Sequence, residues 1–241
     1  MRTRPALAGA LGASLVASLV GMVAAPAAQA YNRDLYTYAA GHMITQSDIP
    51  KALGVFDSRL NFSASPGYKN FLCYVPSEDP QDNGASISTG KSQYQFMANY
   101  NSKKASGPSV QVQVLKYASD SAAIKAFNAM KTMSKKCNGS GSTTSTDDDG
   151  TSYTNSWLVK TSVVPAVSVV GVESIGITQN NLGTDSTSDD PYLNDNYAVY
   201  SLVNDAIIET TYFVNGPKNM TSAQRKAVNQ VAFNAISEWL D

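Results

Sequence analysis

The segment 109–117, SVQVQVLKY, constrains the fold more than any other stretch of the chain. Valines occupy every second position, and glutamines lie between them. Successive side chains of a strand point to opposite faces of a sheet, so this pattern predicts a half-buried antiparallel strand. A helical pattern follows at once over 120–137, with apolar residues on one face and most lysines on the other. The chain therefore has to pack helices against an antiparallel sheet.

Short runs of aromatic and β-branched residues between polar turns predict the other strands. These runs are 71–75, 94–100, 154–164, 168–179, 197–203 and 206–214, of which Asn204-Asp205 joins the last two as a hairpin. A short helix is predicted to be capped by Ser47 or Asp48 and to end at Gly54, and a long one is predicted after Thr221, which forms a capping box with Gln224. Strands come in adjacent runs rather than alternating with helices. This order predicts an α+β fold, a single antiparallel sheet of about six to seven strands with helices packed on it.

Polar stretches between these elements are predicted as loops. They are 76–90, 140–152 and 181–195, the second of which is a low-complexity run of serine, threonine and glycine. Asn138-Gly139 is predicted to end the central helix as a left-handed cap.

Residues 1–30 have the pattern of a secretory signal peptide. Arg2 and Arg4 precede a long apolar stretch, and Ala28-Gln29-Ala30 is a typical cleavage site. A membrane anchor is the alternative, but the stretch is mostly alanine and glycine and contains Pro26. We therefore predict a secreted, extracellular protein with no membrane anchor after cleavage. Its parts are the signal peptide at 1–30, a flexible N-terminal segment at 31–42 and a ligand-binding domain at 43–241.

The net charge argues against two kinds of partner. The chain carries a charge of -1, which becomes -3 when the two arginines leave with the signal (-1 - 2). Its lysines are scattered, so no basic stripe is available for nucleic acid or for an anionic membrane. We expect neither partner, and we expect a monomer.

Cys73 and Cys137 are the only cysteines. A secreted chain with two cysteines most economically joins them in a disulfide. Neither lies in a C-x-x-C motif or beside a histidine, so neither has the sequence surroundings of a reactive thiol. The predicted disulfide would connect the strand 71–75 to the last turn of the central helix.

Common catalytic and metal-binding patterns are missing from the sequence. His42 is the only histidine, and no nucleophile motif lies near it. One histidine and two distant cysteines cannot form an ordinary zinc site. The acidic clusters at 147–149 and 185–190 could bind calcium, but they lack the spacing of a calcium loop, and we expect solvated charge there. No cofactor is predicted.

Carboxylates and aromatic residues remain as candidates for a site. Glu173 and Glu209 lie on predicted strands, where a pair of carboxylates could act as in a glycosidase, although nothing in the sequence pairs them. Four aromatic residues could line a pocket but are more often core: Tyr94, Phe96, Trp157 and Tyr212.

Three segments of the sequence, taken in order, resemble the successive elements of one known protein family. MITQSDIPKALGVF, FLCYVPS and VQVQVLKYASDSAAIKAFNAMKTMSKKCNG are similar to the opening helix, first cysteine strand, alternating strand and cysteine-ended helix of the PknH-type extracellular sensor domain. The resemblance covers about 43–138, and beyond it only the element order and the final helix agree.

The resemblance implies an antiparallel sheet flanked by helices, a cleft for an unknown ligand and no catalysis. Cys73 and Cys137 match the first disulfide of the family, whereas its second disulfide has no counterpart here. The sequence lacks a kinase domain.

We therefore predict a secreted, sensor-like, non-catalytic domain that binds an unknown small ligand or an extracellular protein. Two alternatives remain open, a secreted hydrolase that uses strand or loop carboxylates and an adhesin-like surface protein.

Overall fold

The computed structural model describes residues 33–56, 61–66, 69–75, 85–102, 107–146, 149–185, 192–215 and 220–241. The predicted signal peptide lies outside these residues. The N-terminal part contains α1 (Arg33–Gly41), two short 3₁₀ turns, η1 (Gln46–Asp48) and η2 (Lys51–Leu53), and β1 (Asn61–Pro66) to β5 (Ser109–Lys116). Between β1 and β5 lie β2 (Lys69–Val75), β3 (Ala85–Lys91) and β4 (Tyr94–Asn101). The rest comprises α2 (Asp120–Met133), η3 (Ser134–Lys136), β6 (Gly139–Thr146), β7 (Ser152–Pro165), β8 (Glu173–Asp185), β9 (Tyr192–Val203), β10 (Ala206–Asn215) and α3 (Ser222–Leu240).

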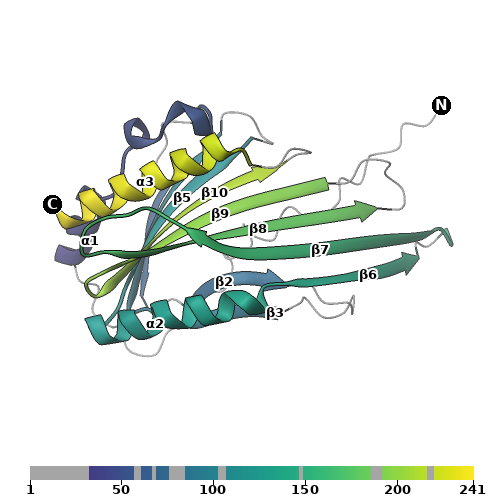
Figure 1. Ribbon diagram of the computed structural model, residues 1–241, viewed down its shortest axis with the longest axis horizontal. Helices are drawn as coiled ribbons and strands as arrows, with labels where there is room; N and C mark the ends of the chain where they lie inside the picture. The colour runs from purple at the N-terminus through teal and green to yellow at the C-terminus, as the bar shows by residue number, and fades with distance from the viewer. Residues whose placement is uncertain are drawn as a thin grey trace. The chain divides into compact units, whose positions relative to one another are not determined.

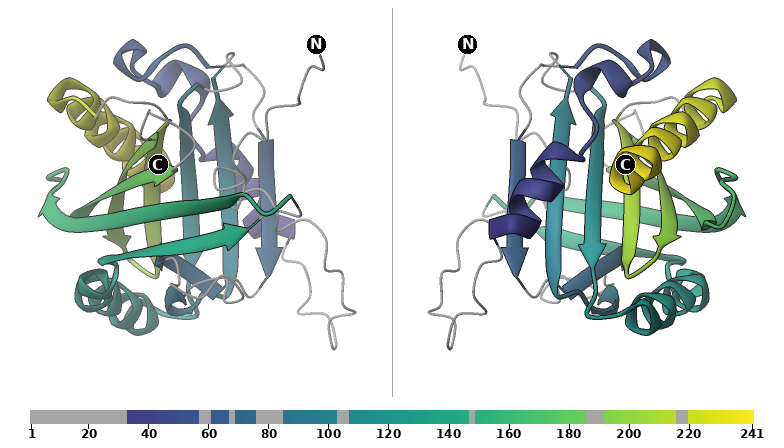
Figure 2. Two further views of the ribbon diagram at one scale, coloured as in Figure 1. Left: turned by 90° about the vertical axis from the view of Figure 1, so that its right-hand side faces the viewer. Right: turned by 90° about the vertical axis from the view of Figure 1, so that its left-hand side faces the viewer.

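Eight strands form one antiparallel sheet in the order β1-β4-β5-β10-β9-β8-β7-β6, and β2 and β3 pair separately. The helix α3 lies on one side of the large sheet, and α2 lies on the other side together with β2 and β3 (Figure 1). The sheet is strongly twisted, because β6 and β7 run across the direction of β4 and β5 (Figure 2). The predicted α+β class with an antiparallel sheet is therefore confirmed, with a higher strand count.

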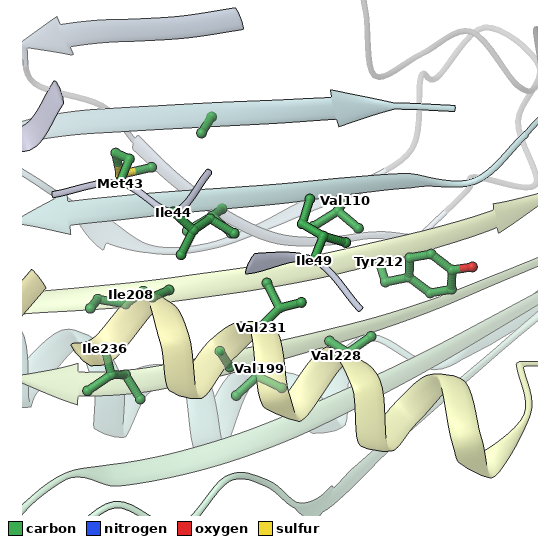
Figure 3. Packing of buried hydrophobic residues seen from close by; sticks show 14 of the residues in the cluster. Met43, Ile44, Ile49, Val110, Val199, Ile208, Tyr212, Val228, Val231 and Ile236 are labelled. Atoms are coloured by element: carbon green, nitrogen blue, oxygen red, sulfur yellow. The ribbon is translucent and has the colours of Figure 1, made fainter. Parts of the chain in front are cut away.

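The α3 side of the sheet carries the larger apolar core. Val228, Val231 and Ile236 of α3 pack against Val199 and Ile208 of the sheet (Figure 3). The alternation predicted for 109–117 explains this contact, because the valines of β5 face the same core and are 1% exposed. The α2 side has a smaller core.

Buried tyrosines hold the two 3₁₀ turns on the α3 side. Tyr100 donates to the carbonyl oxygen of Ile44, and Tyr212 donates to that of Leu53 over 2.8 Å. Thr45 caps η1 together with Asp48. The predicted short helix is thus two separate turns, which end at Gly54 with a φ of 127° that glycine readily adopts.

The N-terminal segment 31–42 contains α1, whose Tyr38 donates a hydrogen bond to the carbonyl oxygen of Trp239 over 2.6 Å. Four predictions of local structure were wrong. The loop predicted at 76–90 includes most of β3, and the one at 140–152 is largely β6 and the start of β7. The loop predicted at 181–195 includes the ends of β8 and β9. No left-handed cap follows α2, because η3 leads directly into β6.

The missed strands contain few large apolar residues. β1 (NFSASP), β3 (ASISTGK) and β6 (GSGSTTST) consist mostly of small polar residues. Their pairing partners specify the strand conformation, because β propensity depends strongly on neighbouring strands.

Candidate functional site

A row of buried polar side chains crosses the α2 side of the sheet. Glu209 on β10 lies directly opposite Gln113 on β5 and Tyr200 on β9. Strand side chains alternate between faces, so these residues point away from the α3 core. We call the following six hydrogen-bonded residues the Glu209 network: Ser65, Gln95, Gln113, Tyr200, Glu209 and Thr211.

The hydrogen bonds of the Glu209 network all point toward the carboxyl group. Ser65 donates to Gln95 Oε1 over 3.2 Å, and Gln95 Nε2 donates to Gln113 Oε1 over 2.6 Å. Gln113 Nε2 then donates to Glu209 Oε2. The other carboxyl oxygen, Oε1, accepts from Thr211 Oγ1 over 2.9 Å and from Tyr200 over 3.2 Å. Such a polarised chain strengthens each of its bonds.

Burial dominates the titration of Glu209. The residue is 7% exposed, and desolvation raises the pKa of its carboxyl group above the ordinary value. Hydrogen bonds from Thr211, Gln113 and Tyr200 favour the ionised form and offset only part of this effect. Raising the pH therefore forces a charge into a site that favours the neutral acid.

We expect the stability of the protein to depend on pH through Glu209. A raised pKa means that the folded state holds the proton to higher pH than the unfolded state. Between the two pKa values, the free energy of unfolding should therefore fall as pH rises. Urea unfolding across the acidic to neutral range should show this fall in the wild type and not in Glu209→Gln. The variant Glu173→Gln removes an exposed carboxyl group and should keep the wild-type slope, so equal slopes in all three proteins would contradict the expectation.

A second polar pair lies on the same face, on β8 and β9. Gln179 is 7% exposed, and its Oε1 accepts from Asn196 Nδ2 over 3.3 Å. Its Nε2 is buried and has no hydrogen-bond partner among the described residues. An unsatisfied buried N–H group costs about 1–3 kcal/mol, so this donor is the clearest unused binding group on the face.

Glu173 lies on the same face but has a different environment. Its carboxylate accepts from Lys131 Nζ of α2 over 2.7 Å, and its side chain is 57% exposed. Register and strand spacing place the Cα atoms of Glu173 and Glu209 roughly 12 Å apart. Glu173 pairs with Lys131, whereas Glu209 accepts from Gln113, Tyr200 and Thr211, so these hydrogen bonds give the two carboxylates no shared partner.

Cys137 lies at the end of the α2 side core and is 0% exposed. No cysteine among the described residues has a free thiol. The other predicted partner, Cys73, lies on β2, whose side chains are outside the description. The helix α2 contacts the adjacent strand β3. The Cys73–Cys137 disulfide stays a prediction.

The acidic clusters are only partly described. Asp149 is exposed and accepts a hydrogen bond from the Thr151 amide over 3.0 Å, which lowers the pKa of its carboxyl group. Residues 147–148 and 186–190 lie outside the description. Among the residues that are described, no three histidine, cysteine, aspartate or glutamate side chains gather closely enough to bind a metal ion.

The aromatic candidates belong mostly to the α3 side core. Phe96 and Tyr212 are 2% and 1% exposed, as expected for core residues. Tyr94 stacks on Phe96 with ring centroids 6.3 Å apart. Trp157 lies on β7, and its side chain is not described. His42 stacks on Tyr38, and its Nδ1 lies 2.7 Å from the Tyr38 carbonyl oxygen.

Sequence reasoning found Glu209 but missed the residues around it. Gln113 was predicted as a polar position of a half-buried strand, and nothing was predicted for Gln95 and Gln179, although β2, β3 and α2 lie on their side of the sheet. The glutamines themselves carried a usable signal. Each lies near apolar residues in its strand, on β4, β5 or β8, and the polar position is a glutamine rather than a lysine or an aspartate.

Fold and site together define an α+β protein with an open antiparallel sheet and a buried polar face. No family model matches the chain, and no curated protein matches it. Among solved structures, the chain is similar in fold to the crystal structure of the extracellular domain of PknH from Mycobacterium tuberculosis. The two share 11% identity over 82% of this chain and 94% of that chain, with a TM-score of 0.45.

Of the helices in the described ranges, none combines the length and the apolar character that a bilayer crossing requires.

Proposed function

We propose that the chain is an exported, non-catalytic, sensor-like domain that binds a small polar ligand on the α2 side of its sheet. The observation that carries this proposal is the buried Nε2 of Gln179, which has no acceptor among the described residues. A carbonyl or hydroxyl oxygen of a ligand would supply that acceptor and recover the free energy that the buried donor costs.

The composition of the face supports a polar ligand over an apolar one. Gln179 and Asn196 lie beside Thr211 and the rest of the Glu209 network, so amide and hydroxyl groups are concentrated there. The carboxyl group of Glu209 already accepts three hydrogen bonds from the protein. Because a carboxylate offers about four acceptor sites, Glu209 is largely committed to positioning its neighbours.

The separation of the acids supports binding without turnover. Glu173 is paired with Lys131 at the surface, and Glu209 is buried among donors. The usual glycosidase mechanism needs two carboxyl groups, one on each side of the scissile glycosidic bond. Turnover of any glycoside or ester that Glu209→Gln abolishes would contradict the non-catalytic proposal.

Mass spectrometry of the protein recovered from culture medium tests export and binding together. The mass under denaturing conditions reports whether residues 1–30 have been removed, and we expect a chain that begins at Tyr31. The native mass reports a bound compound, and we expect one that is rich in oxygen. A full-length mass would contradict export, and a native mass equal to that of the polypeptide would contradict the ligand.

A pair of glutamine variants then locates the ligand. Gln179→Leu should lower the occupancy about tenfold, because it removes the unpaired donor. Gln230→Leu is the matched control, since Gln230 is an exposed glutamine on α3 that bonds only to Asn234 over 2.9 Å among the described contacts. Equal occupancy in both variants would place the ligand elsewhere.

A further inference from the structure

The strand β6 ends the eight-stranded sheet (Figure 1). It pairs with β7 from Gly139↔Val159 to Thr146↔Ser152 without a shift in register. Among the described residues, no strand pairs with its outer edge. The outward N–H and C=O groups of β6 thus form a regular row along an edge eight residues long.

This edge lacks the features that normally prevent strands from pairing between molecules. Edge strands are usually short, bulged, or interrupted by proline or lysine. The sequence of β6, GSGSTTST, contains no charge and no proline, and its ladder has no bulge. The opposite edge strand, β1, is shorter and ends at Pro66. Of the two edge strands of the eight-stranded sheet, as far as it is described, only β6 is therefore a regular edge without such protection.

The side chains of β6 suit a partner strand of the same composition. Ser140, Ser142, Thr144 and Thr146 are exposed on one face. Across the existing ladder, Thr144 and Thr154 place their hydroxyl oxygens 3.1 Å apart, and Thr146 and Ser152 place theirs 3.0 Å apart. A second β6 strand would present the same hydroxyl groups for cross-strand pairs.

The charges that flank β6 favour an antiparallel copy. Lys136 precedes the strand by three positions, and Asp149 follows it by three; both are exposed. Antiparallel overlap brings the Lys136 end of each copy beside the Asp149 end of the other, so opposite charges meet twice. A parallel overlap would bring like charges together. The edge is thus self-complementary in charge as well as in hydrogen bonding.

We propose that two copies of this chain associate through antiparallel pairing of their β6 strands, about a two-fold axis perpendicular to the sheet. Such an interface is isologous, and it joins the two sheets into one. A single strand pair buries less than about 1,200 Å², which is typical of weak association, so dimers form at high protein concentration. This dimer replaces the monomer expected from the sequence.

Sedimentation velocity over a wide range of protein concentration tests the dimer. The wild type should shift from monomer to dimer as concentration rises. Ser142→Lys should raise the dissociation constant by more than about tenfold, because the two-fold axis brings the new lysines close together. Thr154→Lys is the matched control, since it adds the same charge to the same face on β7, away from the edge, and should leave the dimer intact.

Reversing the charges that flank β6 provides a second test, which leaves the strand itself unchanged. Lys136→Glu and Asp149→Lys should each weaken the dimer, and the double variant should restore it. A wild type that stays monomeric at the highest soluble concentration overturns the proposal. So does a dimer that Ser142→Lys leaves unchanged, or a double variant that is weaker than both single variants.

Discussion

Replacing Phe127 with alanine is expected to lower the free energy of unfolding by about 3–5 kcal/mol. Phe127 is 0% exposed and belongs to the α2 side core together with Leu115 and Ile207 of the sheet. Removing the ring leaves a cavity between α2 and the sheet, which rigid strands cannot fill. The ring also lies under Lys131 Nζ, 5.1 Å from the ring centroid.

Urea unfolding of two α2 variants measures this effect. Ile124→Ala is the matched control, because Ile124 lies on the same helix, is 46% exposed and gains similar helix propensity on replacement. A change within about 0.5 kcal/mol is expected for this control. If both variants lose the same free energy, α2 does not pack on the sheet through Phe127.

Phe127→Ala should also affect the Glu209 network on the α2 side of the sheet. Tyr200 belongs to the α2 side core and also donates to Glu209. A cavity at Phe127 therefore loosens Tyr200, which is a member of the Glu209 network. We expect Phe127→Ala to reduce the pH dependence that Glu209 causes, in addition to lowering stability.

The sequence predicted those parts of the fold that carry apolar periodicity. The alternation at 109–117 places Val112 in one core and Gln113 on the opposite face, as observed. Thr221 and Gln224 form the predicted capping box at the start of α3. Asn204, with a φ of 51°, makes the predicted turn between β9 and β10.

Strands without apolar alternation could not be predicted in this way. β6 has no residue larger than threonine, and its conformation depends on eight pairs with β7. Low complexity in the sequence therefore indicated a mobile loop, although the ladder supplies order. Similarly, α1 has little periodicity of its own, and Tyr38 and Ala39 hold it through contacts with the rest of the domain.

The candidate site was less predictable than the fold. Glu209 was named for possible catalysis, but one of its three donors, Gln113, lies on a strand 96 positions away in the sequence. Local sequence does not reveal that β2, β3 and α2 lie on the face where these glutamines point. The buried donor of Gln179 likewise depends on register between β8 and β9.

Removing the predicted disulfide is expected to cost about 4 kcal/mol of unfolding free energy. Cys73→Ser with Cys137→Ser opens a loop of about 65 residues, and the chain-entropy model gives this magnitude. The loop contains β4 and β5 and ends at the buried position of Cys137, so both the sheet and α2 lose a constraint on the unfolded chain. Urea unfolding of the oxidised wild type and the double variant measures the difference. The wild type unfolded under reducing conditions is the control and should match the variant, because both lack the crosslink. Alkylation of both cysteines in the folded protein without reductant, or equal stability with and without reductant, would contradict the disulfide.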